Sequence, residues 1–128
     1  MVLLVEDSAL VSEYLCRFLQ DKGYLACPYD SGDRVIEERE SLKYDIAIID
    51  RSLEGFGDDT SGDDVARKLK EKNPNKPIVI ISCYKAINFD CADYYLRKPF
   101  RFEELLEVLK QARVRFFGHT LEDMADSK

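Results

Sequence analysis

The segment YDIAIID, residues 44–50, contains a run of four apolar side chains that ends abruptly in Asp50. A run this short and this uniformly apolar is typical of a strand buried on both faces, as in a parallel sheet. The aspartate stands at the carboxyl end of the expected strand, and open parallel sheets bind their ligands at that edge. Asp50 is therefore the first candidate for a functional residue.

Four further runs of similar length predict four more strands. They are Val2–Val5, Tyr24–Tyr29, Ile78–Ile81 and Tyr94–Leu96. The run at 24–29 is weaker because it carries a proline, which suits an edge strand or a strand end.

Helical patterns separate these runs. Helices are expected near residues 8–22, 33–41, 62–72 and 102–117. Ser31 and Ser61 are typical N-caps, and Gly23 is a typical helix stop. Apolar residues share one face of the first helix and recur at helical spacing in the last. In the first helix they are Val11, Tyr14, Leu15, Phe18 and Leu19. In the last they are Phe102, Leu105, Leu106, Leu109, Ala112 and Phe116. The alternation of strands and helices predicts an α/β fold with a doubly wound parallel sheet.

Length and composition narrow the class of protein. The 128 residues suffice for one domain with a hydrophobic core, and an apolar fraction of 45% argues against a disordered chain. No apolar run approaches the roughly 20 residues of a membrane span, and the start MVLLVED lacks the basic region of a secretory signal. A net charge of −6 argues against a nucleic-acid-binding surface. We therefore expect a cytoplasmic protein that contacts neither membranes nor nucleic acid directly.

Four of the five expected strands end in a reactive polar group. Glu6 and Asp7 follow the first strand, Asp50 ends the third, Ser82 the fourth, and Lys98 follows the fifth. Because parallel strands end at one edge of the sheet, these side chains are expected to converge there.

This set of side chains suits phosphoryl transfer. A carboxylate can accept a phosphoryl group as an acyl phosphate, and additional carboxylates bind a hard cation such as Mg²⁺. A lysine and a hydroxyl then neutralise or bind the phosphoryl oxygens. Two carboxylates 4 Å apart repel by about 4 kcal/mol at an effective dielectric constant of 20, so three together make a poor structural motif without a cation.

The motifs LLVEDS (3–8), YDIAIID (44–50), PIVIIS (77–82) and DYYLRKPF (93–100) together resemble the receiver domains of response regulators. The resemblance runs from Val2 to about Phe117. It implies a flavodoxin-like fold with a five-stranded parallel sheet of order 2-1-3-4-5 and five helices. Residues 1–118 would form the receiver domain, and residues 119–128 a polar tail.

The resemblance also implies a role for each candidate. Asp50 is the phosphorylated residue. Asp7, Asp50 and the backbone carbonyl of Ser52 bind Mg²⁺ directly, and Glu6 binds it through water.

Other roles concern the phosphoryl group and the response to it. Ser82 and Lys98 contact the phosphoryl group, Tyr95 and Ser82 act as switch residues, and the Lys98–Pro99 peptide bond is cis.

Two connections depart from the family pattern. The acidic loop 51–64 is long, with Gly62 twelve residues after Asp50, whereas Lys98 follows Ser82 by only sixteen residues. The second spacing predicts a fourth helix that is short or absent. Cys83 and Tyr84 also stand where small residues are usual.

The expected function is a phosphoacceptor switch in a two-component phosphorelay. A sensor histidine kinase or a phosphotransfer protein would supply the phosphoryl group, and the downstream effector is unknown. The chain would catalyse only its own phosphorylation and dephosphorylation, as a monomer or weak homodimer.

Three alternatives fit less well. A phosphatase or phosphotransferase of the haloacid dehalogenase type needs an acid two residues after its nucleophile, where this chain has Ser52. A flavin-binding module needs a phosphate-cradling loop after the first strand, and EDSAL is acidic there. A pseudo-receiver used only for protein binding should have lost Asp7, Asp50 or Lys98, and all three are present.

Overall fold

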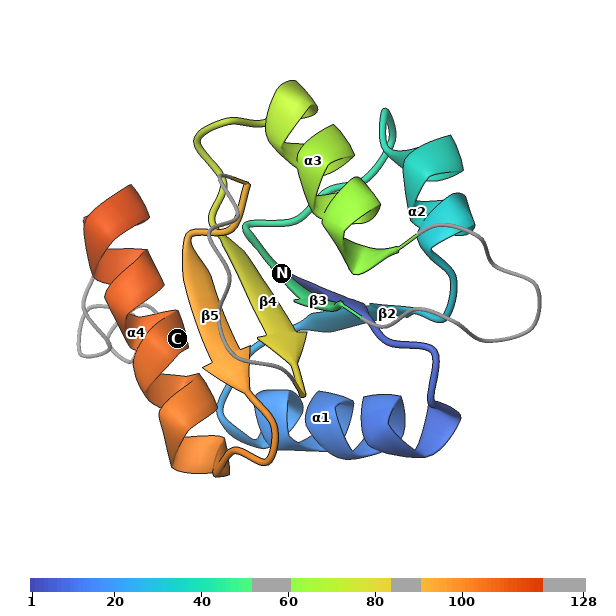
Figure 1. The fold of residues 1–128 in the computed structure, drawn as a ribbon. Coiled ribbons are helices and arrows are strands. Elements are labelled where there is room, and N and C mark those ends of the chain that lie inside the picture. Colours follow the sequence, from blue (N-terminus) through green and yellow to red (C-terminus); the bar gives the residue numbers. More distant parts are fainter. Residues whose placement is uncertain (52–60, 84–90, 119–128) are drawn as a thin grey trace.

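A computed structural model of the chain describes residues 1–51, 61–83 and 91–118 (Figure 1). Five strands and four helices occur in these ranges, in the predicted order. They are β1 (Val2–Val5), α1 (Ala9–Asp21), β2 (Ala26–Tyr29), α2 (Gly32–Glu38), β3 (Ile46–Asp50), α3 (Gly62–Lys72), β4 (Ile78–Ser82), β5 (Tyr94–Arg97) and α4 (Phe102–Phe117).

The five strands form one parallel sheet of order β2-β1-β3-β4-β5, which confirms the predicted topology. Helices α1 and α4 cover one face of the sheet, and α2 and α3 cover the other (Figure 1). Strand β2 lies beside β1 at one edge of the sheet, and the chain then crosses over to place β3 on the opposite side of β1. The carboxyl ends of β1 and β3 are therefore neighbours at the point where the strand order reverses, which is the usual ligand site of such sheets.

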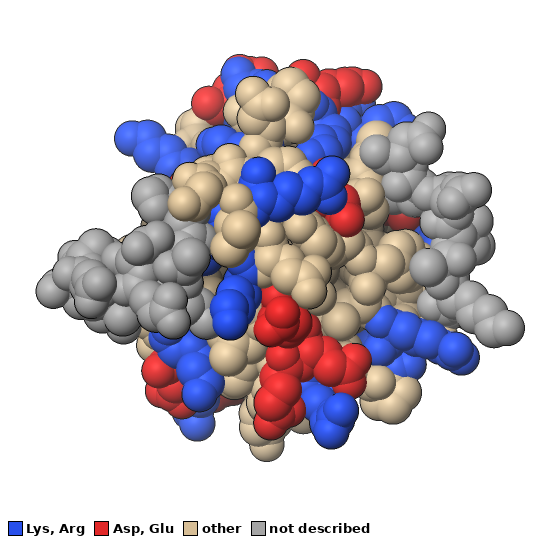
Figure 2. Space-filling model, turned by 90° about the vertical axis from the view of Figure 1, so that its left-hand side faces the viewer, with Lys and Arg blue, Asp and Glu red and all other residues tan. Residues whose placement is uncertain are grey.

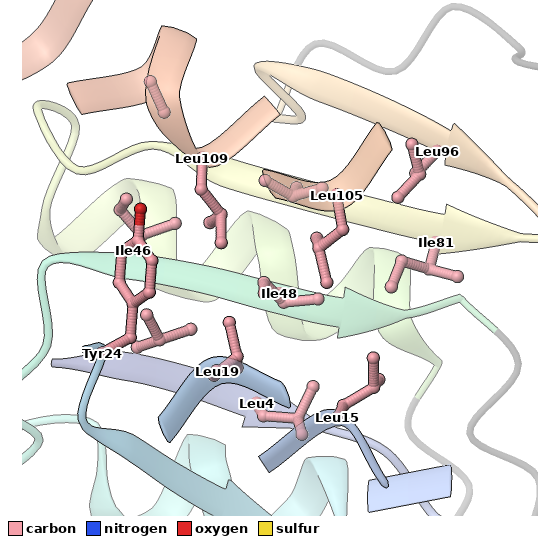
Figure 3. Packing of buried hydrophobic residues seen from close by; sticks show 13 residues of the cluster. Leu4, Leu15, Leu19, Tyr24, Ile46, Ile48, Ile81, Leu96, Leu105 and Leu109 are labelled. Atoms are coloured by element: carbon pink, nitrogen blue, oxygen red, sulfur yellow. The ribbon is translucent and has the colours of Figure 1, made fainter. Parts of the chain in front are cut away.

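Apolar side chains fill both sides of the three central strands. Every residue of β1, β3 and β4 is buried, whereas the edge strands β2 and β5 are only partly buried. Leu15 and Leu19 of α1 pack with Leu105 and Leu109 of α4 on Ile48 and its neighbours in the sheet (Figure 3). The apolar runs in the sequence thus correspond to the buried strands of a doubly wound fold.

Local hydrogen bonds set the ends of the helices. The side chains of Ser8, Ser31 and Ser61 each accept a hydrogen bond from a backbone amide in the first helical turn, which confirms the two predicted serine caps. Gly23 ends α1 with a φ of 90°, a conformation that glycine adopts without strain.

Two boundaries differ from the sequence prediction by more than one residue. Strand β2 begins at Ala26 instead of Tyr24, because the Tyr24 amide still donates to the Leu19 carbonyl at the end of α1. Helix α2 ends at Glu38 instead of Ser41. The Ser41 hydroxyl donates to the carbonyl of Glu38, which ends the last helical turn.

The buried face of α1 is narrower than its apolar pattern predicts. Leu15 and Leu19 are buried, but the side chain of Tyr14 is 62% exposed and that of Val11 is 37% exposed. Phe102, at the start of α4, is also exposed. These three side chains border a pocket beside the carboxyl edge of the sheet and do not enter the core.

Some expectations fall outside the described residues. They concern the expected metal ligand Ser52, most of the acidic loop 51–64 and the tail 119–128. They also concern residues 84–90, in the connection where the fourth helix was expected to be short or absent. Within the described ranges, no helix has the length and apolar character to cross a membrane.

Candidate functional site

Strand ends bring the candidate residues together at the carboxyl edge of the sheet. Asp50 is the last residue of β3, Glu6 and Asp7 follow the adjacent β1, and Ser82 is the last residue of β4. Lys98 follows β5, and its backbone amide donates to the Ser82 carbonyl at 2.8 Å. The predicted convergence is therefore present in the fold.

Three carboxyl groups form a cluster at this edge. One carboxylate oxygen from each of Glu6, Asp7 and Asp50 lies within 4.8 Å of the other two. Glu6 is only 4% exposed and Asp50 only 6% exposed, whereas Asp7 is partly exposed. Oxygen donors on neighbouring strand ends, with one side open to water, match the preference of Mg²⁺ for a few carboxylates and several waters.

Lys98 supplies the positive charge of the site. Its Nζ lies 2.7 Å from Oδ2 of Asp50, which makes a partly buried ion pair. Burial opposes the charge on Lys98, but the hydrogen bond and the negative charge of Asp50 outweigh it and raise the pKa of Lys98 above its usual value. The pair therefore keeps a cation beside the candidate nucleophile at neutral pH.

The site also changes the ionisation of Glu6. Burial, a side-chain hydrogen bond with Asp50 and the negative charge of Asp50 raise the pKa of Glu6 to about 8, from an ordinary value of 4.5. Lys98 acts in the opposite direction, and Asp7 raises the pKa slightly further. Without a divalent cation, this shift favours the protonated form of Glu6 at neutral pH, which relieves the repulsion among the three acids.

The remaining candidates differ in how closely they approach Asp50. Ser82 is buried, at the end of the strand next to β3. Tyr95 lies within β5, and its hydroxyl accepts a hydrogen bond from Nη1 of Arg51 at 2.6 Å. The Lys98–Pro99 peptide bond is cis, which confirms the expectation from the resemblance.

Sequence reasoning did not identify Arg51 and Asp63 as part of this region. Arg51 contacts Asp63 in the first turn of α3 as well as Tyr95 of β5. Only the position of Arg51 next to Asp50 could have drawn attention to it, because no periodic pattern links residues 51, 63 and 95.

A small apolar pocket opens beside the acidic cluster. It has a volume of about 190 Å³ and reaches Asp50 and Lys98. Its apolar wall comes from α1 and from the start of α4, including Val11, Tyr14 and Phe102. A partner that contacts this wall would lie directly next to the candidate nucleophile.

Comparisons with known proteins identify the family of this chain. The sequence profile of the response regulator receiver domain matches residues 2–110. The transcriptional regulatory protein CusR of Escherichia coli K12 is 33% identical over 120 residues, which are 89% of this chain and 49% of CusR. A cyclic di-GMP phosphodiesterase of Thermotoga maritima is 29% identical over 91% of this chain and 32% of its own length. The chain thus spans half or less of these two curated relatives.

A solved structure gives a match over nearly its whole length. The response regulator protein TrrA of Thermotoga maritima, crystallised in complex with Mg²⁺ and BeF, is 30% identical with a TM-score of 0.75. The match covers 87% of this chain and 96% of TrrA. Motifs, sheet order and family match agree, and the chain belongs to the response regulator receiver domains, the phosphoacceptor switches of two-component systems.

Proposed function

We propose that Asp50 accepts the phosphoryl group in a reaction that requires Mg²⁺. The observation that carries this assignment is the position of Asp50, which belongs to a cluster of three carboxyl groups and is paired with Lys98 at 2.7 Å. An oxygen of Asp50 would attack the phosphorus of the donor, and the bond from phosphorus to the donor's leaving atom would break. The product is an acyl phosphate on Asp50 and the free donor.

The residues around Asp50 prepare it for this attack. The Lys98 ammonium favours the ionised, nucleophilic form of Asp50 and is free to move to a phosphoryl oxygen on its flexible stem. The Ser82 hydroxyl would donate to a second phosphoryl oxygen, and Ser82 and Tyr95 would respond as switch residues. Bound Mg²⁺ would neutralise charge on the phosphoryl oxygens.

The acidic cluster is the proposed metal site. Asp7, Asp50 and the Ser52 carbonyl would bind Mg²⁺ directly, and Glu6 would bind it through water. The donor set supports this choice because it consists of oxygen atoms alone. The complex of TrrA with Mg²⁺ and BeF, a relative with 30% identity, is consistent with such a site here.

A sensor histidine kinase or a phosphotransfer protein is the proposed donor. Leu10 is 66% exposed and Tyr14 is 62% exposed on the first turns of α1, and Tyr14 lines the pocket that reaches Asp50. Exposed apolar side chains this close to a reactive group suit a protein partner that must present a phosphorylated side chain.

The remaining properties follow from the receiver role. We propose that residues 1–118 act as the switch, that the chain catalyses only its own phosphorylation and dephosphorylation, and that it works in the cytoplasm as a monomer or weak homodimer. The face that carries α4 has basic side chains scattered around a compact acidic group (Figure 2), which suits a protein effector better than nucleic acid.

Intact-mass measurement tests the assignment of the nucleophile. Incubation with Mg²⁺ and a small acyl-phosphate donor should add one phosphoryl group to the wild type and none to Asp50→Asn. Asp45→Asn is a matched control, because Asp45 is exposed and pairs with the N-terminus far from the cluster. Modification of Asp50→Asn to the same extent as the wild type would refute the assignment.

A further inference from the structure

Other elements fix the backbone of Arg51, the residue directly after the proposed nucleophile. The Arg51 amide donates to the Ile81 carbonyl of β4 at 2.9 Å, and its carbonyl accepts from the amide of Gly62 at 3.1 Å. A Cβ atom on Gly62 would lie only 2.2 Å from the carbonyl oxygen of Asp50. The start of α3 therefore packs directly on the backbone of residues 50 and 51.

The Arg51 side chain joins three elements of the fold. Its Nη1 lies 2.6 Å from the Tyr95 hydroxyl of β5, and its Nε and Nη2 lie 3.2 and 3.1 Å from Oδ2 of Asp63 in α3. The side chains of Arg51 and Asp63 are only 22% and 24% exposed, so water screens the pair less than it would on an open surface. We call these contacts of Arg51 with Tyr95 and Asp63 the Arg51 bridge.

The Arg51 bridge complements the ion pair of Lys98 on the opposite face of the sheet. Ile49, Ile80 and Tyr95 lie in one row across β3, β4 and β5. Arg51 follows Ile49 by two residues and shares its face, whereas Asp50 points to the other face. The segment made of β5 and Lys98 thus has two contacts with the end of β3. Lys98 pairs with Asp50, and Tyr95 accepts a hydrogen bond from Arg51.

Strand β5 needs such an attachment because it is short and lies at the edge of the sheet. It has four residues and pairs with β4 alone among the described strands. Lys98 follows β5 directly, and its backbone amide donates to the Ser82 carbonyl of β4 at 2.8 Å. The backbone position from which the Lys98 side chain reaches Asp50 therefore depends on how firmly β5 is held at this edge of the sheet.

We propose that Arg51 is a positioning residue for the phosphorylation of Asp50. Through Tyr95 and Asp63 it holds β5, and with it Lys98, in register with the end of β3. The inference rests on the proposed function of Asp50 and adds to it a side chain that is assigned neither to the metal nor to the phosphoryl group. Loss of the bridge should slow the reaction, because charge stabilisation depends on groups that are already in place.

Rates of phosphorylation by a small acyl-phosphate donor test the proposal. Arg51→Ala should react roughly tenfold more slowly than the wild type, within the range that small displacements of reacting groups produce. Tyr95→Phe should react more slowly by a smaller factor, and the double variant should be no slower than Arg51→Ala. Arg17→Ala, which removes an exposed arginine paired with Glu13, should keep the wild-type rate.

All rates are compared at a temperature where circular dichroism shows every variant folded. If Arg51 contributes only to global stability, the phosphorylation rates of the folded variants should then equal that of the wild type. A wild-type rate for folded Arg51→Ala would overturn the proposal. Slow reaction of Arg51→Ala together with a wild-type rate for Tyr95→Phe would also overturn it, because Arg51 would then act through its charge alone.

Amide hydrogen exchange gives an answer that does not depend on phosphorylation. The amides of Gly62 and Lys98 donate to Arg51 and Ser82, so Arg51→Ala should accelerate their exchange while Arg17→Ala should not. Unchanged exchange at both amides would overturn the proposed attachment. If the wild type itself fails to react, the proposed function of Asp50 is refuted, and the exchange data still decide whether Arg51 holds β5 and α3 at the end of β3.

Discussion

Nζ of Lys98 lies 2.7 Å from Oδ2 of Asp50, although 48 positions separate the two residues and β4 lies between their strands. Lys98→Met should leave Glu6, Asp7 and Asp50 without their cation and destabilise the fold by about 1 to 3 kcal/mol. Urea unfolding without divalent metal measures this change. The matched control is Lys110→Met, an exposed lysine of α4, and equal stability of the two variants would contradict the prediction.

The protonation of Glu6 predicts a dependence of stability on pH. Its pKa of about 8 in the folded protein exceeds the ordinary 4.5, so between these values the folded state binds a proton that the unfolded chain has lost. This stabilising contribution is complete below about pH 4.5 and is lost as the pH rises through 8. The slope approaches about 1.4 kcal/mol per pH unit for one proton.

Urea midpoints between pH 5 and 9 in a chelating buffer measure this slope. The glutamine in Glu6→Gln cannot ionise, so the free energy of unfolding of this variant should depend less on pH than that of the wild type. The variant should also be more stable than the wild type at pH 9. A slope identical to that of the wild type would show that other groups cause the dependence.

Magnesium binding should release a proton near neutral pH. The raised pKa of Glu6 favours its protonated form without metal. The positive charge of Mg²⁺ close to Glu6 favours the carboxylate, which would bind the metal through water. Calorimetric titrations with Mg²⁺ in buffers of different ionisation enthalpy should reveal this proton release. At a hundred times its dissociation constant, Mg²⁺ should add about 2.7 kcal/mol to stability. Both effects should disappear in Asp7→Ala, and their persistence there would place the metal elsewhere.

Gly62→Ala should destabilise the protein, although alanine normally stabilises a helix relative to glycine. The added Cβ atom would lie 2.2 Å from the Asp50 carbonyl oxygen and 2.6 Å from the Arg51 Cα, and backbone atoms cannot move aside as a flexible side chain can. We expect a loss of about 1 to 3 kcal/mol by thermal or urea unfolding. A gain in stability would mean that α3 does not pack on residues 50 and 51.

The exposed start of α1 should matter for the protein donor but not for a small donor. Leu10→Asp should slow phosphoryl transfer from a cognate kinase and leave phosphorylation by a small acyl phosphate unchanged. Leu25→Asp is the matched control, because Leu25 is equally exposed, at 68%, near the opposite end of α1. Equal loss with both donors would indicate misfolding instead of a docking defect.

Most of the fold could be predicted from the sequence because its signals are local. Apolar runs of four or five residues mark β1, β3 and β4, and serine caps mark the starts of α2 and α3. The errors occur where tertiary contacts compete with the local pattern. The Tyr24 amide pairs with the end of α1 and not with β1, and the aromatic ring of Tyr14 stays in solvent.

The sequence also determined which residues would meet at the site. Parallel strands place their carboxyl ends at one edge, so polar residues that follow apolar runs must converge there, however far apart they stand in the chain. Glu6, Asp7, Asp50 and Lys98 therefore share one edge of the sheet, whatever conformations their side chains adopt.

Only the tertiary structure decided how these groups affect one another. The proton on Glu6 depends on its burial and on its hydrogen bond with Asp50, and neither has a signature in the sequence. The contacts of Arg51 with Asp63 and Tyr95 likewise depend on how α3 and β5 pack around the end of β3. Charge and hydrogen-bond energies change over a few ångströms, whereas a sequence pattern specifies only the strand or the face on which a residue lies.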